Sequence, residues 1–139
     1  MSIGYGSLVR KISEDNTHVL YAYGDINLNV PGLENSSKIC DGTLLVAKKC
    51  FIEPEIHQKI KRMPSGRKRL VTKSIIRSVD IEASLLNGSI EIENSSFAWK
   101  FCQTQDSRKI DIMAVRALEK IFEDYQRTGE MPEITGWFV

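Results

Sequence analysis

The chain has 139 residues, of which 42% are hydrophobic and 27% are charged, and its 19 Lys and Arg residues nearly balance 18 Asp and Glu residues. This length fits one domain, residues 1–139, and is enough for a hydrophobic core that needs no disulfide support. The composition excludes collagen-like and intrinsically disordered chains, and a net charge of +1 gives no simple reason to expect a nucleic-acid binder.

The start of the chain and its cysteines favour a soluble cytoplasmic protein. The first ten residues lack the basic and apolar regions of a secretory signal, and no run approaches the roughly 18 apolar residues that a membrane-spanning helix needs. Cys40, Cys50 and Cys102 are odd in number and widely spaced, unlike the cysteines of a disulfide framework or a zinc site. We therefore expect no membrane contact, no metal and no cofactor.

The first half of the sequence predicts a β-hairpin and then a third strand. The expected elements are strands at residues 5–12, 18–23 and 43–51, a turn at residues 13–16, and a long connection at residues 24–38. In the second strand Val19, Tyr21 and Tyr23 recur at every second position, so they share one face.

The middle of the sequence predicts a short helix and another strand. Residues 53–62 begin with Glu-Pro-Glu, and a first helical turn tolerates proline and favours carboxylates near the positive end of the helix dipole. Ile56 and Ile60 would then lie one turn apart on the buried side. Residues 64–66, Pro-Ser-Gly, end this helix, and residues 67–77 have the apolar content of a strand.

The following segment predicts a second short helix and a second hairpin. Asp80 is placed to cap a helix at residues 81–86, and strands at residues 89–93 and 97–101 would pair with each other. The aromatic side chains that share one face of the last of these strands are Phe97, Trp99 and Phe101. We expect that face to be core, with stacking on nucleic-acid bases as the alternative.

The strongest expected element is a long amphipathic helix near the C-terminus. Asp106 and Ser107 are placed to cap it, and Gly129 to end it in the left-handed conformation. The apolar residues that recur at helical spacing are Ile110, Met113, Ala114, Ala117, Leu118, Ile121 and Tyr125. A last short strand is expected at residues 134–139.

These elements predict an α+β fold in a single domain. We expect a mainly antiparallel sheet of about five to seven strands, one long C-terminal amphipathic helix and one or two short helices.

The balanced total charge conceals a strongly uneven distribution. Residues 48–77 contain ten cations and two anions, whereas residues 78–139 contain six cations and eleven anions. The densest basic cluster, which has no acidic residue, consists of Lys59, Lys61, Arg62, Arg67, Lys68 and Arg69. The acidic residues on the final helix and after it include Glu119, Glu123, Asp124 and Glu130.

Each charged cluster has more than one interpretation. The basic cluster is typical of a solvated face or a protected edge strand, of a surface that binds an acidic protein, or of a phosphate-binding surface. The acidic cluster is typical of the wet side of an amphipathic helix, of a partner-binding face, or of an internal counterpart to the basic cluster.

Catalytic motifs are absent from the sequence, which has no phosphate-binding glycine loop, nucleophile elbow or metalloprotease helix. A ribonuclease that uses His57 with neighbouring lysines is the most plausible enzymatic alternative, but nothing in the sequence brings His57 and His18 together. We therefore expect a protein that is not an enzyme.

Two stretches carry a resemblance, residues 53–57 (Glu-Pro-Glu-Ile-His) and 63–68 (Met-Pro-Ser-Gly-Arg-Lys). With the early Tyr-Gly and the late amphipathic helix, they resemble a group of small uncharacterised bacterial proteins similar to immunity proteins of polymorphic toxin systems, including contact-dependent growth inhibition. The resemblance implies a protein that binds and neutralises one cognate toxin without cofactor or catalysis. Nucleic-acid binding through residues 59–69 is the alternative, and a small His-dependent nuclease is the third hypothesis.

Overall fold

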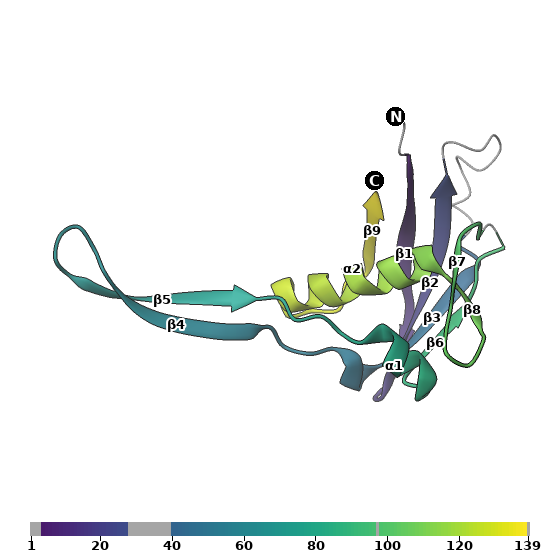
Figure 1. Ribbon diagram of the computed structural model, residues 1–139, viewed down its shortest axis with the longest axis horizontal. Coiled ribbons are helices and arrows are strands. Elements are labelled where there is room, and N and C mark those ends of the chain that lie inside the picture. The colour runs from purple at the N-terminus through teal and green to yellow at the C-terminus, as the bar shows by residue number, and fades with distance from the viewer. Residues whose placement is uncertain (1–3, 28–39, 97, 139) are drawn as a thin grey trace.

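A five-stranded antiparallel sheet forms the body of the molecule (Figure 1). The computed structural model describes residues 4–27, 40–96 and 98–138. The sheet has the order β6-β3-β2-β1-β9, and its strands are β1 (Tyr5–Glu14), β2 (His18–Asn27), β3 (Gly42–Ala47), β6 (Ile90–Glu93) and β9 (Ile134–Phe138). The expected first hairpin is confirmed, and in its turn the Asp15 carboxylate accepts hydrogen bonds from the backbone amides of Thr17 and His18, both at 2.7 Å.

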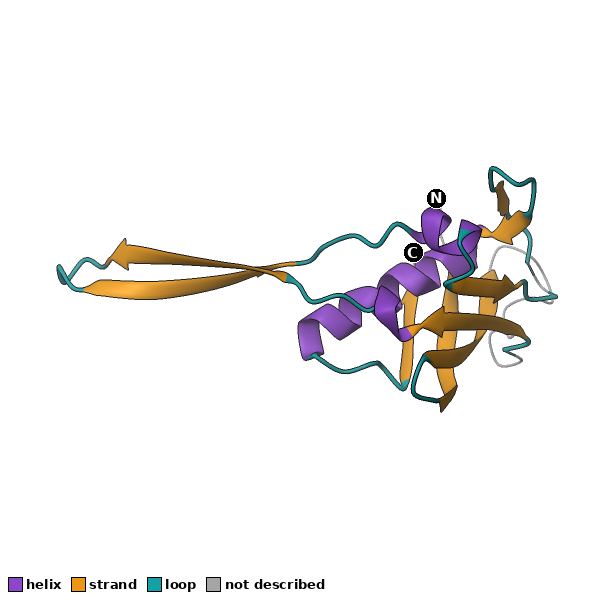
Figure 2. Cartoon of the chain, turned by 90° about the horizontal axis from the view of Figure 1, so that it is seen from below, coloured by secondary structure: helices purple, strands orange, loops and turns teal. Residues whose placement is uncertain are grey.

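Helix α2 (Ile112–Thr128) packs across one face of this sheet (Figure 2). The buried helix residues are Met113, Ala114, Ala117, Leu118, Ile121, Phe122 and Gln126. They meet an inward-facing sheet surface made of Val9, Val19, Tyr21, Tyr23, Leu44, Val46 and Ile90, all of them 0% exposed. The predicted α+β class, the mostly antiparallel sheet and the long C-terminal helix are therefore confirmed.

The ends of α2 show one wrong and one confirmed prediction. The helix begins five residues later than expected, because Asp111, and not Asp106, caps it by accepting a hydrogen bond from the Met113 amide at 2.9 Å. Asp106 instead binds the Arg108 guanidinium within a turn. At the other end Gly129 has φ 79° and donates to the Tyr125 carbonyl, as the sequence predicts.

The remaining short elements surround the body. They are a 3₁₀ helix η2 (Lys48–Cys50), helix α1 (Ile81–Leu86), and strands β7 (Phe101–Gln103) and β8 (Lys109–Asp111). The strand expected at residues 43–51 therefore ends at Ala47, where η2 begins. Asp80 caps α1 as expected, with its side chain accepting from the Ala83 amide at 3.0 Å.

The predicted hairpin between residues 89–93 and 97–101 is wrong. Strand β6 pairs with β3 in the main sheet, and β7 pairs with β8 in a separate two-stranded ribbon. The expected aromatic core face is not formed by Trp99 and Phe101, which are 36% and 45% exposed, while Phe97 lies outside the described residues. The alternation of apolar residues predicted β6 correctly, but the strand expected at residues 97–101 is wrong, because residues 98–100 are not strand and β7 begins only at Phe101.

The largest correction concerns residues 53–62, which form no helix. Strands β4 (Glu55–Arg62) and β5 (Lys68–Ile75) form a long antiparallel hairpin that projects away from the body (Figures 1 and 2). Ile56 and Ile60, expected in the core, are 53% and 67% exposed. Their spacing of four residues places them on one face of a strand as well as of a helix, so pairing with β5 decided the structure.

Candidate functional site

The projecting hairpin, residues 55–75, is the most unusual feature of the molecule and is called the arm below. Every residue of β4 and β5 is exposed, and eight cross-strand pairs run from Glu55–Ile75 at its base to Arg62–Lys68 at its tip. At the tip the Met63 amide donates to the Arg67 carbonyl at 2.8 Å. Gly66 has φ 84°, which this tight turn requires.

The register of the arm gives it two different faces. Cross-strand partners share a face and successive residues alternate, so Ile56, Ile60 and Leu70 lie together on one side, called the apolar face. Leu70 is 58% exposed, and it lies directly opposite Ile60. The other side, called the cationic face, contains Glu55, His57, Lys59, Lys61, Arg69, Val71, Lys73 and Ile75.

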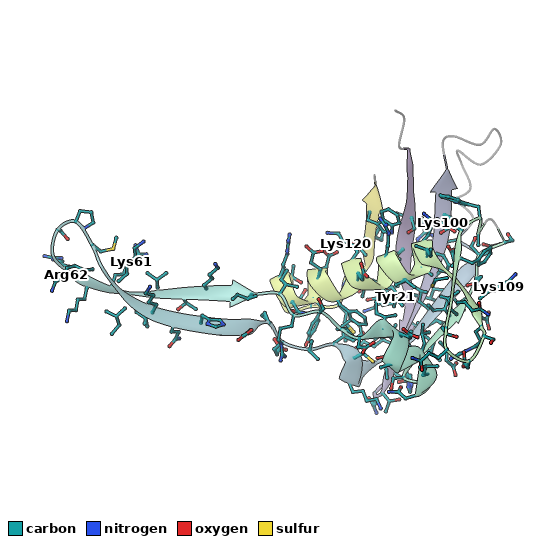
Figure 3. The ribbon with its side chains drawn as sticks, viewed as in Figure 1. Tyr21, Lys61, Arg62, Lys100, Lys109 and Lys120 are labelled. Carbon is teal, nitrogen blue, oxygen red and sulfur yellow. The ribbon has the colours of Figure 1, made fainter. Side chains whose placement is uncertain are left out.

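The positive charge of the arm is not neutralised by other parts of the described chain. The arm contains seven cations, Lys59, Lys61, Arg62, Arg67, Lys68, Arg69 and Lys73, and a single carboxylate, Glu55. The ion pairs of the described residues involve other cations, and Glu55 itself pairs with His57 at 2.9 Å. Figure 3 shows Lys61 and Arg62 close to the tip, far from the body. The six predicted basic site residues therefore lie together on one exposed element.

Contacts at the base of the arm fix where it leaves the body, and no sequence pattern indicated them. The buried side chain of Gln126 on α2 accepts from the Arg77 amide at 2.8 Å and donates to the Arg77 carbonyl at 2.7 Å. The Arg77 guanidinium donates to the Glu53 carbonyl, and the Tyr125 hydroxyl donates to the Glu53 carboxylate at 3.0 Å. This group, Glu53, Arg77, Tyr125 and Gln126, is called the root.

The second predicted site, the acidic face of α2, is less acidic than its sequence suggests. Glu123 pairs with Arg127 at 2.6 Å and Asp124 with Lys120 at 2.9 Å, both one helical turn apart. Glu119 and Glu130 are exposed. The structure places none of these four carboxylates in an ion pair with the basic arm, so the two charged clusters remain separate surfaces.

The two histidines lie on separate elements. His57 is on the arm, whereas His18 lies at the start of β2, where its Nδ1 is 2.9 Å from the Thr17 hydroxyl. His18 lines a shallow cavity of about 440 Å³ together with Lys48 and Lys49. The pairing of histidines that an acid–base nuclease needs is therefore not found on the arm.

A buried polar cluster lies beneath the N-terminus of α2, and the sequence patterns did not predict it either. Asp25 and Asp111 are 1% and 0% exposed. The Tyr23 hydroxyl donates to Asp111 Oδ2 and accepts from the Ser95 amide, each at 2.9 Å. Burial, followed by the adjoining Asp111 carboxyl and the charge of Asp41, raises the pKa of Asp25 to about 9.

No metal site in the described residues and no known relative indicates what the chain does. Within the described ranges, no group of three or more His, Cys, Asp or Glu side chains is placed to hold a metal ion. Nor does any helix in those ranges combine the length and apolar character that crossing a bilayer requires. No family model, curated protein or solved structure matches the chain significantly.

Proposed function

We propose that this protein is a non-catalytic, cytoplasmic protein-binding module whose arm docks on a partner protein. The observation that carries the proposal is the apolar face, where Ile56, Ile60 and Leu70 are each more than half exposed. Large apolar side chains gathered on one exposed surface are typical of interaction sites. An isolated two-stranded hairpin is also only marginally stable in water, so binding would stabilise the arm.

The charge of the arm specifies the chemistry of the partner. Seven cations against one carboxylate favour a partner surface with an acidic rim around an apolar groove. Long-range attraction to such a surface would speed association and make its rate dependent on salt. The root supports this role, because Gln126 holds the Arg77 backbone through two hydrogen bonds and so fixes the direction in which the arm is presented.

We further propose that the partner is a toxin domain which this protein neutralises. The resemblance to small uncharacterised bacterial proteins, which are similar in size and style to immunity proteins of polymorphic toxin systems, supports this choice of partner. A single tight contact with the toxin would suffice for neutralisation. A toxin bound by this arm must offer acidic groups, because the projecting element is basic. The acidic face of α2, with two of its four carboxylates already paired, is the weaker candidate for contact with a basic toxin.

The partner that the proposal expects is a toxin domain encoded next to the gene for this protein, and that domain provides the test. Wild-type protein should bind it in calorimetry and restore growth to cells that express it. Leu70→Ala should weaken binding about 10- to 100-fold, as expected for an apolar residue at the centre of an interface. The matched control is Val71→Ala, one residue along the same strand on the cationic face, which should weaken it much less. Absence of both binding and protection would refute the proposal.

Nucleic-acid binding is the second candidate, favoured by the tip of the arm. A two-stranded ribbon can enter a groove of duplex DNA, and architectural proteins that bind the minor groove insert apolar residues such as Met and Pro between base steps. Met63 and Pro64 lie in the turn at the tip, between Arg62 and Arg67, and these two arginines would supply the phosphate contacts.

Fluorescence anisotropy with labelled duplex DNA and single-stranded RNA tests this candidate at 50 and 200 mM salt. The logarithm of the binding constant should fall steeply with the logarithm of salt concentration. Replacing Arg67, Lys68 and Arg69 by alanine should reduce that slope on duplex DNA by about 0.9 for each phosphate that is no longer neutralised. Equal binding by wild type and triple variant, or no binding at low salt, would exclude it.

A further inference from the structure

Both long edges of the arm are open. Within the part of the chain that the structure describes, β4 and β5 pair only with each other, and Figure 2 shows no other element beside them. The Met63 amide donates to the Arg67 carbonyl, so every second residue of β4, counted back from Met63, directs its backbone groups toward β5. The residues between them direct their amides and carbonyls to the outer edge. On β4 these outward residues are Ile56, Gln58, Ile60 and Arg62.

The side chains of β4 alternate as its backbone groups do. Ile56 and Ile60 lie on the apolar face and are more than half exposed, whereas Lys59 and Lys61 lie on the cationic face. The ion pairs of the described residues include neither lysine. In a neighbouring strand alternate residues recur at the same spacing of roughly 6.7 Å, and β-branched or oppositely charged neighbours stabilise the pairing. The strand that fits this edge best therefore alternates apolar residues with carboxylates.

The charge pairs of the arm favour an acidic strand over a second copy of the arm. Lys61 lies directly opposite Arg69, and Arg62 lies directly opposite Lys68. Like charges in directly opposite positions destabilise a hairpin, and the described ion pairs neutralise none of these four side chains. A second arm on this edge would bring further cations to it, as lysines on edge strands do to prevent aggregation. A strand that carries carboxylates would reduce the repulsion.

We infer that the acidic rim of the proposed partner protein contains an extended segment, which adds to the outer edge of β4 as a third strand of the arm. The outward amides and carbonyls of β4 make its backbone hydrogen bonds. Its carboxylates lie beside Lys59 and Lys61, and its apolar residues lie beside Ile56 and Ile60. A sheet of three strands is more stable than a two-stranded hairpin, so the added strand also stabilises the arm. The inference rests on the proposed function and specifies how the partner is bound.

Amide hydrogen exchange of the full chain, measured by NMR, tests the inference. The probe is a synthetic peptide as long as β4, eight residues, which alternates Glu and Val and has blocked ends. With peptide in excess, the outward amides of β4 at residues 56, 58, 60 and 62 should exchange at least tenfold more slowly. The outward amides of β5, at residues 68, 70, 72 and 74, are the internal control and should change less than threefold. Equal protection of both sets, protection of neither, or no binding at about 1 mM peptide overturns the inference.

A charge exchange then tests which strand the carboxylates contact. The double variant Lys59→Glu, Lys61→Glu should lose affinity for the Glu-Val peptide at least tenfold and should bind a Lys-Val peptide instead. The matched control, Arg69→Glu with Lys73→Glu, makes the same change on the same face of β5. It should bind the Glu-Val peptide at least threefold more tightly than the β4 variant does. Equal affinities of the two double variants, or binding of duplex DNA but not of the peptide, would refute the added strand.

The toxin domain separates this inference from the proposed function. A toxin that binds the chain and is weakened by Leu70→Ala, but does not protect the outward amides of β4, would leave the proposed function standing and overturn only the added strand. Protection of those amides by the toxin, together with weaker toxin binding by the Lys59→Glu, Lys61→Glu variant, would support both.

Discussion

Replacing Asp25 with asparagine tests the buried carboxyl pair through the pH dependence of folding stability. In the folded chain the pKa of Asp25 is raised to about 9, whereas an unfolded aspartate titrates near about 3.9. Between these values the folded state holds a proton that the unfolded state has lost. The free energy of unfolding must therefore fall as pH rises through this window.

The size of the effect follows from the proton count. One proton held by the folded state changes the free energy of unfolding by at most about 1.4 kcal/mol per pH unit, or about 2.7 kcal/mol from pH 6 to pH 8. The adjoining Asp111 carboxyl helps to keep the proton on Asp25, because a second buried carboxyl disfavours the ionised form of Asp25. Asn cannot ionise but keeps the shape of Asp and can donate to Asp111. Asp25→Asn should therefore remove this slope and gain stability relative to wild type as pH rises.

Urea unfolding followed by circular dichroism at pH 5.5, 6.5, 7.5 and 8.5 measures this difference. The range avoids most other shifted groups, because hydrogen bonds to neighbouring residues lower the pKa of Asp15 and Asp106, which titrate in acid. Asp106→Asn is the matched control and should leave the slope above pH 5.5 unchanged. If wild type and Asp25→Asn give parallel curves, Asp25 is already ionised in the folded protein and the reasoning fails.

Three further predictions concern single side chains and are checked with the same unfolding assay or by hydrogen exchange. Tyr23→Phe removes the hydroxyl that donates to Asp111 and should lower the free energy of unfolding by about 1–3 kcal/mol. An unchanged free energy of unfolding would mean that a water molecule replaces the tyrosine hydroxyl. Gly129→Ala should lower the free energy of unfolding by about 1 kcal/mol, because the φ of 79° at Gly129 is unfavourable for a residue with a Cβ. Steric crowding is not the cause, since an added Cβ would meet no atom of the surrounding structure within 4 Å. Gln126→Leu leaves the Arg77 amide without its hydrogen-bond acceptor, so hydrogen exchange at that amide should accelerate. Amide exchange in the five-stranded sheet should stay unchanged, and equal acceleration in both regions would contradict a local role for the root.

The body of the fold was predictable because its signals are local and consistent. The first hairpin combines alternating apolar residues with a turn rich in Asp and Asn, and α2 repeats its apolar residues over four turns. In both elements the periodicity matches only one secondary structure. The same reasoning predicted Asp80 and Gly129 at helix ends, where short-range hydrogen bonds alone decide the residue type.

The arm was not predictable because its decisive interactions are not local. Ile56 and Ile60 fit a helix and a strand equally well, and the preceding Glu-Pro-Glu favours a helix start. Residues 55–62 are a strand because they pair with β5 across the Met63–Arg67 turn. This pairing could not be predicted from the local pattern of a single sequence. The six basic residues predicted as a binding site nevertheless lie together on the arm, because a cluster of charges along the sequence does not depend on the secondary structure that forms. Their role in binding a partner stays a prediction.

The exposure of the arm has a consequence for proteolysis. Trypsin cleaves after Lys and Arg, and the seven such residues of the arm are all accessible on a ribbon joined to the body only at its base. Limited digestion of the free chain should therefore cut first between residues 59 and 73, well before the buried strands of the sheet. Because any molecule that covers the arm shields these bonds, the cleavage pattern gives a footprint of whatever binds there, even before the partner is identified.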